Sequence, residues 1–367
     1  MRSTAVVDLD ALRANVASVK ALVGDAQVMT VVKADAYGHG LVPCARAAVE
    51  AGATWLGTAF LEEALALRAA GLTVPVLAWL QTPVDDLAPA VEADVDLGIY
   101  SLAELARAVD AAERAGRTAR LQLKVDTGLS RGGCTPADWS ELVEASAKAQ
   151  AGSAVEITGV WSHLAFAEDG PDHPVNVAQK AAFADALQVA DALQPEVRHL
   201  ANSAALLTDP TTHHDLVRAG AATYGLHPAP AFGDFGLRPV MTLRTEVALT
   251  KRVPAGAGVS YRHRYTADGD TTLALVPLGY GDGIPRNATN VAPVQVRGTS
   301  YRVSGTVAMD QLVVDVGDDP VEAGDEVVLF GEGGPSAQEW ADVTGTIDYE
   351  IVTRIGARVP RTYVGER

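Results

Sequence analysis

A lysine stands where an apolar run of the sequence ends. Residues 28–32 read Val-Met-Thr-Val-Val, and Lys33 follows them directly within the segment VVKADAYGHG. An amine at such a place is either solvated on the rim of a sheet or shielded enough to lose its proton, and a neutral amine can form a Schiff base with an aldehyde. Taken singly, Lys33 fits a solvated rim residue better than a reactive amine. His39 in the same segment has no assigned partner and is expected to be solvated.

Groups that could bind a phosphate occur much later in the chain. Ser203 lies at a predicted helix start within HLANSAA, and Gly220 and Ala221 follow the short apolar run 216–219. Each could be a plain cap or turn, but N–H groups at a helix N-terminus also bind phosphates. Together with Lys33 they indicate one ligand that carries an aldehyde and a phosphate. Pyridoxal phosphate (PLP) has both groups.

Further charged or titratable residues follow other apolar runs. Lys124 and Arg131 occur in KVDTGLSRGG, His163 occurs in WSHLAFAED, and Arg218 occurs in LVRAGAATYGL. In a parallel β/α barrel, the functional groups gather at the carboxyl ends of the strands. The sequence therefore predicts that these side chains meet Lys33 at one rim.

The elements that must position these residues alternate along the chain to about residue 225. Eight short apolar runs, separated by helical stretches, cover residues 28–32, 54–59, 74–79, 95–100, 120–125, 155–161, 197–201 and 216–219. Most do not alternate apolar with polar residues, as expected of parallel strands that are buried on both faces. Eight units predict a TIM-like (β/α)8 barrel. The alternative, a doubly wound open sheet, more often has five or six strands and a longer glycine fingerprint than the GHG found here.

A second domain is predicted after the barrel. The segment HPAPAFGDFG, which begins at His227, is rich in proline and glycine, and beyond it the helical period disappears. Short β-rich segments separated by Gly, Asp and Asn follow, with one short helix expected over residues 336–343. We therefore divide the chain into a barrel over residues 1–230 and a smaller, mainly β domain over residues 231–367.

Composition excludes several classes of protein. The 367 residues contain 29 Lys and Arg against 46 Asp and Glu, a formal net charge of -17. This balance argues against nucleic acid or an anionic membrane surface as the main partner, because phosphate backbones are bound by basic residues. No signal peptide or membrane span is recognisable, so we expect a cytoplasmic protein. The two cysteines, Cys44 and Cys134, exclude a disulfide framework, and no zinc-site spacing occurs, so no metal is expected.

The order of the motifs resembles one enzyme family. VVKADAYGHG, KVDTGLSRGG, SHLA, HLANSAA, VRAGAATYGL, GVSYRHRYTA, LGYGDG, GTVAMDQ and TIDYE follow one another as in alanine racemases, from about residue 8 to the end of the chain. The resemblance implies a PLP-holding barrel followed by a β domain. It also implies an isomerase that interconverts L-alanine and D-alanine and supplies D-alanine for peptidoglycan. The family's homodimer has shared active sites, so a second copy of the chain is the expected partner.

The resemblance assigns roles residue by residue. Lys33 would hold the cofactor and act as one acid/base, and Tyr261 would be the other. The phosphate would be bound by Tyr37, Ser203, Gly220, Ala221 and Tyr349. Arg218 would face the pyridine nitrogen.

The remaining roles concern the substrate. Arg131 would lie near the cofactor's phenolic oxygen and the substrate carboxylate. Lys124, which in relatives can carry a carbamate, would orient Arg131. Met309 and Tyr280 would complete the pocket from the partner subunit.

The two-base assignment also has a physical basis. Racemisation removes the Cα proton from one face and returns a proton to the other, so a base is needed on each side. Tyrosine has a reference pKa of about 10, too high for a base near neutral pH. A hydrogen-bond chain from Tyr261 through His163 to Arg218 would favour the phenolate.

Three alternatives stay open at this point. A PLP-dependent decarboxylase could use a similar scaffold, but it would need a carboxylate in place of Arg218 opposite the pyridine nitrogen. A non-catalytic PLP-binding barrel would lack the β domain that carries Tyr261. A racemase of broader specificity for small amino acids is compatible with the same residues.

Overall fold

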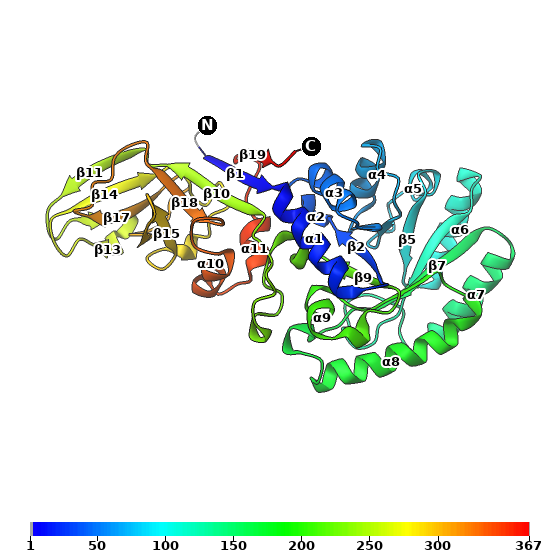
Figure 1. Cartoon of the computed structure of the whole chain (residues 1–367). Helices are drawn as coiled ribbons and strands as arrows, with labels where there is room; N and C mark the ends of the chain where they lie inside the picture. The colour runs from blue at the N-terminus through cyan, green and yellow to red at the C-terminus, as the bar shows by residue number, and fades with distance from the viewer. Residues whose placement is uncertain (1–2, 367) are drawn as a thin grey trace.

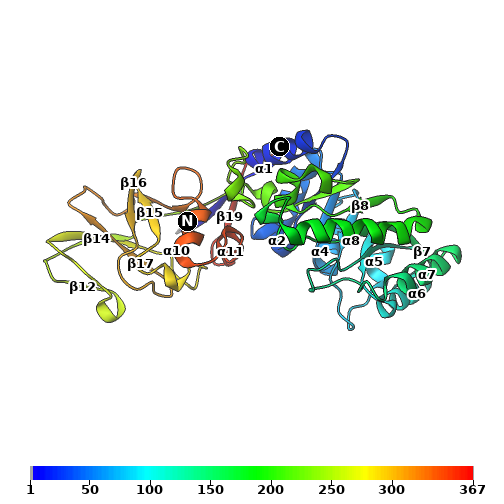
Figure 2. The ribbon, with the colours of Figure 1, turned by 90° about the horizontal axis from the view of Figure 1, so that it is seen from below.

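The computed structural model, which describes residues 3–366, has two domains that lie side by side (Figure 1). One is built on an eight-stranded parallel sheet, and the other consists mainly of antiparallel strands. Figure 2 shows the same division from below, with the strands of the second domain on one side and the helices of the first on the other.

The eight strands of the first domain form a nearly closed barrel. They are β2 Gln27–Val31, β3 Trp55–Thr58, β4 Val76–Ala78, β5 Val95–Ile99, β6 Ala119–Lys124, β7 Val155–Trp161, β8 Val197–His199 and β9 Leu216–Ala219. The sheet order is β8-β7-β6-β5-β4-β3-β2-β9. Its two ends approach each other where the Arg218 N–H donates to the Ala201 carbonyl (3.0 Å) and the Asp215 N–H donates to the Arg198 carbonyl (3.1 Å). The prediction of a TIM-like barrel with these eight strands is confirmed.

Helices surround the barrel. They are α1 Leu9–Val23, α2 Lys33–Tyr37, α3 Leu41–Glu50, α4 Leu61–Ala69, α5 Ala88–Glu92, α6 Leu102–Ala115, α7 Trp139–Ala151, α8 Pro174–Ala190 and α9 Ser203–Thr208. All five residues of β5 are buried, as expected when side chains point alternately into the barrel and against helices. Ser101 caps helix α6, because its side chain accepts from the Glu104 N–H (3.2 Å).

The second domain contains a six-stranded, a three-stranded and a two-stranded sheet. The six-stranded order is β16-β15-β18-β10-β1-β19, the three-stranded order is β11-β14-β17, and β12 pairs with β13. These strands are β1 Ser3–Asp8, β10 Met241–Glu246, β11 Leu249–Val253, β12 Gly258–Val259, β13 Tyr265–Thr266, β14 Thr271–Val276, β15 Pro293–Val296, β16 Thr299–Arg302, β17 Leu312–Gly317, β18 Glu326–Phe330 and β19 Arg361–Val364. Two helices complete it, α10 Ala337–Thr344, close to the predicted position, and α11 Asp348–Thr353, which was not predicted.

The structure corrects the proposed division of the chain at its N-terminal side. Strand β1 precedes the barrel in sequence, but it pairs with β10 and β19 in the six-stranded sheet. Its side chains alternate between buried and half-buried, the pattern of a strand with one face in a core. Strand β1 runs directly into α1, so the chain enters the barrel from the second domain.

A buried asparagine connects α1 to the linker between the domains. The Asn15 amide donates to the carbonyls of Thr223 (3.1 Å) and Arg238 (2.8 Å), and its oxygen accepts from the Arg238 N–H (2.8 Å). One buried side chain therefore pairs three backbone groups, of which the Thr223 carbonyl is itself buried.

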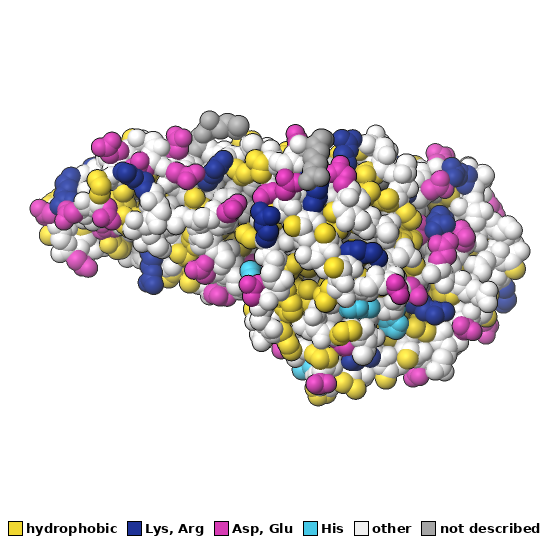
Figure 3. Space-filling model, in the orientation of Figure 1, with side chains coloured by type: hydrophobic (Ala, Val, Ile, Leu, Met, Phe, Trp, Pro, Cys, Tyr) yellow, Lys and Arg dark blue, Asp and Glu magenta, His cyan; other side chains and the backbone are white. Residues whose placement is uncertain are grey.

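The outer surface matches the composition. On the face drawn in Figure 3, acidic and basic side chains are interspersed over both domains. Among the helices of residues 3–366, none combines the length and the apolar character that a membrane crossing requires.

We expect Asn15→Ala to lower the free energy of unfolding by about 2–4 kcal/mol, because it leaves the buried partners of the amide without hydrogen bonds. Urea denaturation followed by circular dichroism measures this loss. Ser18→Ala, at an exposed position of the same helix, is the control and should unfold with the parent protein. Equal stability of the two variants would contradict the role given to Asn15.

Candidate active site

Arg218 lies at the centre of the candidate site. It is buried at the carboxyl end of β9, and its two terminal nitrogens donate to five acceptors. These are the Nδ1 and carbonyl O of His199 (3.0 and 3.2 Å), Ser162 O (2.8 Å), Leu200 O (3.0 Å) and His163 Nδ1 (3.0 Å). Within residues 3–366, no acceptor was found for its Nε–H. One donor of a rigidly held guanidinium is thus left for a ligand.

Two histidines at adjacent strand ends hold Arg218. His163 and His199 each open a His-Leu-Ala tripeptide, after β7 and at the end of β8. Because a guanidinium only donates, the Nδ1 atom of both rings must be an unprotonated acceptor. Burial and the charge of Arg218 hold the pKa of both imidazoles well below the usual value, so both rings are neutral. The predicted link between His163 and Arg218 is present, whereas His199 was missed although its tripeptide repeats that of His163.

Positive charges gather at this rim without carboxylate partners. Among the described residues, no ion pair joins Lys33, Lys124, Arg131 or Arg218 to an acidic group. Burial and the charge of Arg131 lower the pKa of Lys33. Burial, then Arg218 and Arg131, lower the pKa of Lys124 to about 8, and burial and Arg131 lower that of Arg218 to about 9. Such a cluster is suited to an anionic cofactor and a substrate carboxylate.

Aromatic rings line the floor of the cluster. The Lys33 Nζ lies 5.8 Å from the centre of the Trp79 ring, and the Lys124 Nζ lies 4.6 Å from Trp161 and 5.2 Å from Tyr100. The Tyr100 hydroxyl donates to the Trp79 carbonyl. Both amines thus lie against aromatic rings.

The loop that carries Arg131 is ordered by a carboxylate. Asp126 accepts from the N–H groups of Gly128 (2.9 Å), Leu129 (3.0 Å) and Ser130 (3.1 Å). Arg131 follows this turn and is exposed. The predicted substrate-binding arginine is thus available at the mouth of the barrel.

A left-handed turn presents Lys33. The four residues after it, Ala34 to Tyr37, all have φ between 53° and 55°, a conformation that costs about 1–2 kcal/mol per non-glycine residue. The Glu63 carboxylate binds the start of the turn, accepting from the Ala34 N–H (2.6 Å). Glu63 also accepts from the N–H groups of Ala59 (2.9 Å) and Phe60 (3.1 Å).

The end of the turn is fixed by His39 and Gly40. Contrary to the prediction of a solvated ring, His39 is fully buried, and its Nδ1 donates to the carbonyls of Ala36 and Tyr37 (both 2.9 Å). A Cβ on Gly40 would lie 1.9 Å from the Tyr363 hydroxyl oxygen. Any larger residue at position 40 would therefore clash with Tyr363 of β19. Local sequence gave no sign of this turn, because its supports come from other elements.

The predicted phosphate ligands converge around Gly220. A Cβ there would lie 2.4 Å from the Tyr37 hydroxyl oxygen, and the rings of Tyr37 and Tyr349 are 6.1 Å apart. Burial raises the pKa of both tyrosines, so both hydroxyls keep their protons and can donate. Neither hydroxyl has a hydrogen-bond partner within the described part of the chain.

Ser203 and the amides of the next turn complete this cradle. The Ser203 hydroxyl accepts from the N–H groups of Gly220 (2.9 Å) and Ala222 (3.2 Å), while the Ala221 N–H meets no acceptor among residues 3–366. The Gly220 N–H could therefore donate to a phosphate only if it gave up, or shared, its hydrogen bond to the Ser203 hydroxyl. With Lys33 near and Arg218 offering its Nε–H, the residues present fit pyridoxal phosphate.

Tyr261, Tyr280 and Met309 are not part of this rim. They lie on the second domain, and Figure 1 shows β13, just after Tyr261, at the opposite end of the molecule from β7. The segment that precedes Met309 contacts both tyrosines, since the Thr306 hydroxyl donates to Tyr261 O (2.8 Å) and the Tyr280 N–H donates to Ala308 O (3.0 Å). Their exposed fractions are 69%, 42% and 53%.

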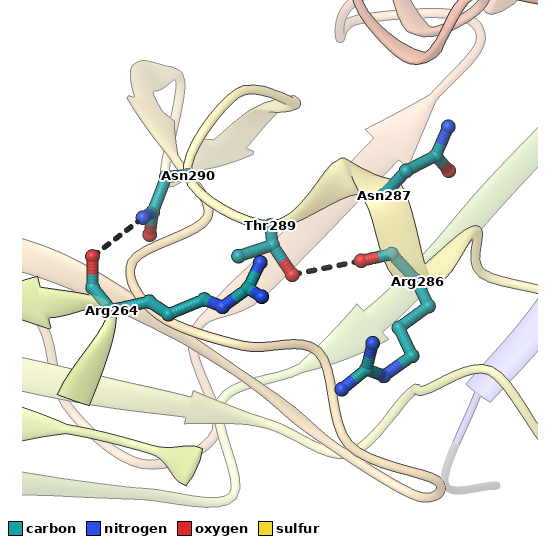
Figure 4. Close-up of a pocket in the computed structure, with 5 residues that line it drawn as sticks. All are labelled: Arg264, Arg286, Asn287, Thr289 and Asn290. Carbon is teal, nitrogen blue, oxygen red and sulfur yellow. Dashed lines mark hydrogen bonds between the residues drawn. The ribbon is translucent and has the colours of Figure 1, made fainter. Parts of the chain in front are cut away.

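A broad pocket of about 700 Å³ lies next to these residues rather than at Lys33. It is lined by Arg264, Arg286, Asn287, Thr289 and Asn290, and Figure 4 shows the two arginine side chains extending towards each other. Asn290 donates to the Arg264 carbonyl (2.8 Å), and Thr289 donates to that of Arg286 (2.8 Å). The pocket thus adds two positively charged side chains to the surface that carries Tyr261, Tyr280 and Met309.

We expect Glu63→Ala to weaken the binding of pyridoxal phosphate about tenfold or more, because the left-handed turn that carries Lys33 and Tyr37 loses its support. Equilibrium dialysis of the cofactor against apoprotein measures this directly. Glu62→Ala removes the same charge from an exposed neighbour and should bind as the parent does. Unchanged affinity in Glu63→Ala would show that the turn holds without the carboxylate.

Comparison with known proteins agrees with this geometry. The family model for the N-terminal domain of alanine racemase matches residues 7–228, and that for the C-terminal domain matches residues 240–363. The chain is 60% identical to an alanine racemase of Frankia casuarinae, with 99% of this chain and 97% of that protein covered. It is 57% identical to an alanine racemase of Thermobifida fusca, with 98% and 97% covered.

Solved structures give the same result. The alanine racemase of Streptomyces lavendulae, a producer of D-cycloserine, superposes with a TM-score of 0.98 at 55% identity, covering 100% of this chain and 98% of that one. The alanine racemase of Bartonella henselae, solved with covalently bound pyridoxal phosphate, superposes with a TM-score of 0.90 at 28% identity, covering 99% and 100%. With both domains matched, the chain belongs to the alanine racemase family.

Proposed function

We propose that Lys33 of one chain and Tyr261 of a second chain are the two bases that move the Cα proton. The reaction is that of the family, the interconversion of L-alanine and D-alanine with pyridoxal phosphate, which supplies D-alanine for peptidoglycan. The observation that carries the proposal is the separation of the two residues. Lys33 is half-buried at the barrel rim, whereas Tyr261 is 69% exposed on the other domain.

Lys33 is suited to take or return a proton on one side of the substrate. Its lowered pKa increases the fraction of neutral amine near pH 7. Its backbone follows β2 and enters the turn that Glu63 supports, so its direction is fixed. Tyr261 would serve the other side, with its hydroxyl close to His163, which Arg218 keeps neutral.

Arg218 limits the chemistry to proton transfer. When bound, pyridoxal phosphate withdraws electrons from the Cα of the amino acid and makes its proton acidic. Arg218 would direct its Nε–H to the pyridine nitrogen, and because its pKa of about 9 keeps it protonated at neutral pH, it would leave that nitrogen without a proton and the electron withdrawal moderate. A decarboxylase would need a carboxylate at this position, which disfavours that alternative.

Substrate binding falls to the remaining residues. Arg131 would bind the alanine carboxylate, with Lys124 beside it. At a pKa of about 8, an appreciable part of Lys124 is neutral, the form that can add carbon dioxide to give a carbamate. Met309 and Tyr280 would close the pocket from the second chain.

A head-to-tail dimer would bring these parts together. The exposed fractions of Tyr261, Met309 and Tyr280 are unusual for large side chains that gather on one surface of a monomer. Two-fold symmetry would place the β domain of each chain over the barrel of the other and create two identical sites. The two arginines of the neighbouring pocket, Arg264 and Arg286, would then add positive charge near both mouths.

We expect Lys33→Ala to lose covalent attachment of the cofactor and nearly all racemisation. Borohydride reduction of the parent protein, followed by peptide mapping, should label the peptide that contains Lys33. Lys124→Ala is the matched control, because it removes an equally placed amine and should leave the label on Lys33. A label on the Lys124 peptide would reject the assignment.

A mixed dimer tests whether the site is shared. Lys33→Ala and Tyr261→Phe chains should each be inactive alone. If each site takes Lys33 from one chain and Tyr261 from the other, a mixed dimer has one intact site. Random pairing of an equal mixture after refolding then gives roughly a quarter of the parent activity.

The control for this experiment is a mixture of Lys33→Ala with Lys33→Ala carrying a mass tag, which reports pairing without restoring activity. Mixed dimers that are present by mass spectrometry and yet inactive would mean that Tyr261 acts in its own chain or not at all.

A further inference from the structure

A chain of buried polar side chains runs through the barrel beneath Arg218. It comprises His199 of β8, Gln122 of β6 and Asp96 of β5, and all three are fully buried. Fully buried polar groups are costly unless each is paired, and a carboxylate is the costliest of them. Asp96 is therefore the residue whose presence most needs an explanation.

Every link of the chain is a hydrogen bond of ordinary length. Arg218 Nη1 donates to His199 Nδ1 (3.0 Å), and His199 Nε2 contacts Gln122 Oε1 (2.8 Å). Gln122 Nε2 donates to Asp96 Oδ2 (3.1 Å). Asp96 also accepts from the Thr158 hydroxyl (2.5 Å) and from Arg120 Nε (2.8 Å).

The two ends of the chain determine the direction of every hydrogen bond within it. A guanidinium only donates and a carboxylate only accepts. His199 must therefore carry its proton on Nε2, and the Gln122 amide must turn its oxygen to His199 and its nitrogen to Asp96. No other arrangement pairs all four groups.

The histidine ring is also held in its plane. It stacks on Trp161 at 5.5 Å with an angle of 4° between the rings, and the Arg218 guanidinium lies 5.2 Å from the centre of the same tryptophan ring. The tautomer of His199 therefore decides whether Nη1 has a nitrogen acceptor in addition to the His199 carbonyl (3.2 Å). If it changed, an N–H would face an N–H and Arg218 would have to turn, moving its Nε–H.

We propose that Asp96 is a positioning residue for Arg218, and that it acts through Gln122 and His199 by fixing the tautomer of the imidazole. The proposal deepens the function given above and rests on Arg218 facing the pyridine nitrogen. The charge of Asp96 is balanced by its ion pair with Arg120 (2.8 Å), so Asp96 acts on Arg218 through the hydrogen bonds rather than as its counter-ion.

The test compares two charge-removing variants at the same end of the chain. Asp96→Asn replaces a carboxylate, which only accepts, by an amide that can also donate to Gln122, so the orientation of Gln122 is no longer fixed from this end of the chain. Glu156→Gln removes a carboxylate that also contacts Arg120 (3.2 Å) but is exposed and does not touch Gln122. Nitrogen NMR of histidine-labelled apoprotein should report the Nε2–H tautomer of His199 in the parent and in Glu156→Gln, and a mixture of tautomers in Asp96→Asn.

Activity gives a second readout. Asp96→Asn should lower kcat about tenfold or more, the size seen when a supporting hydrogen-bond partner is removed from other sites, and should raise the share of transamination. Glu156→Gln should retain both properties of the parent. A parent protein that does not racemise alanine would reject the proposed function, whereas an active parent with an unaffected Asp96→Asn rejects only the role of Asp96.

A double exchange separates positioning from folding. In Asp96→Asn/Gln122→Glu the carboxylate moves one place along the chain and can accept directly from His199 Nε2–H, with nearly the same volume. The tautomer and most of the lost kcat should return, even if Asp96→Asn alone folds poorly. A tautomer that is unchanged in Asp96→Asn, or that is not restored in the double variant, would overturn the proposal.

Discussion

A buried guanidinium that can only donate hydrogen bonds is the constraint on which this site depends. Arg218 occupies the middle of a barrel where charge is costly, so acceptors must surround it. Three backbone carbonyls and two imidazole nitrogens meet that need. The carbonyls belong to the ends of β7 and β8, which are drawn to β9 at the seam of the barrel. The same bonds that satisfy the charge therefore help to close the fold.

The neutrality of the histidines follows from the same contact. Each imidazole turns a lone pair towards Arg218, so protonating either one would set two positive charges face to face in a dry environment. Because both imidazoles stay neutral, neither competes with the reacting groups for the proton that the site transfers. Lys33 and Lys124 are also lowered in pKa by burial and by nearby positive charges, and Lys33 differs from Lys124, Arg218 and the histidine His199 in being only half-buried.

Strain is concentrated where the chemistry requires a fixed amine. Four non-glycine residues in the left-handed conformation follow Lys33, and such a turn persists only when its surroundings determine it. Glu63 binds the beginning of the turn, and the His39 ring, two residues beyond it, binds the carbonyls at its end. The β domain contributes as well, since Arg361 Nε donates to the Gly38 carbonyl (2.8 Å). The second domain thus stabilises the site in its own chain as well as carrying Tyr261.

The sequence by itself determined the barrel, the β domain and most residues at the rim. Eight apolar runs of strand length and the types of the residues that follow them are local features, and Lys33, Lys124, His163 and Arg218 are all found where those runs predict. The tyrosines, Tyr37, Tyr261, Tyr280 and Tyr349, came from the order of motifs instead, since a tyrosine in a loop has no local sign of its role.

Only the tertiary structure decided which groups satisfy one another. Strand β1 joins a sheet whose other members begin more than 200 residues later, Glu63 binds the turn after Lys33 from a separate helix, and Asp96 is connected to Arg218 through two further strands. Such pairings depend on how strands are ordered around the barrel and on which side chains point inward. Periodicity along the chain predicts that a residue is buried, but the partner of a buried polar group is set by the residues that folding brings to it.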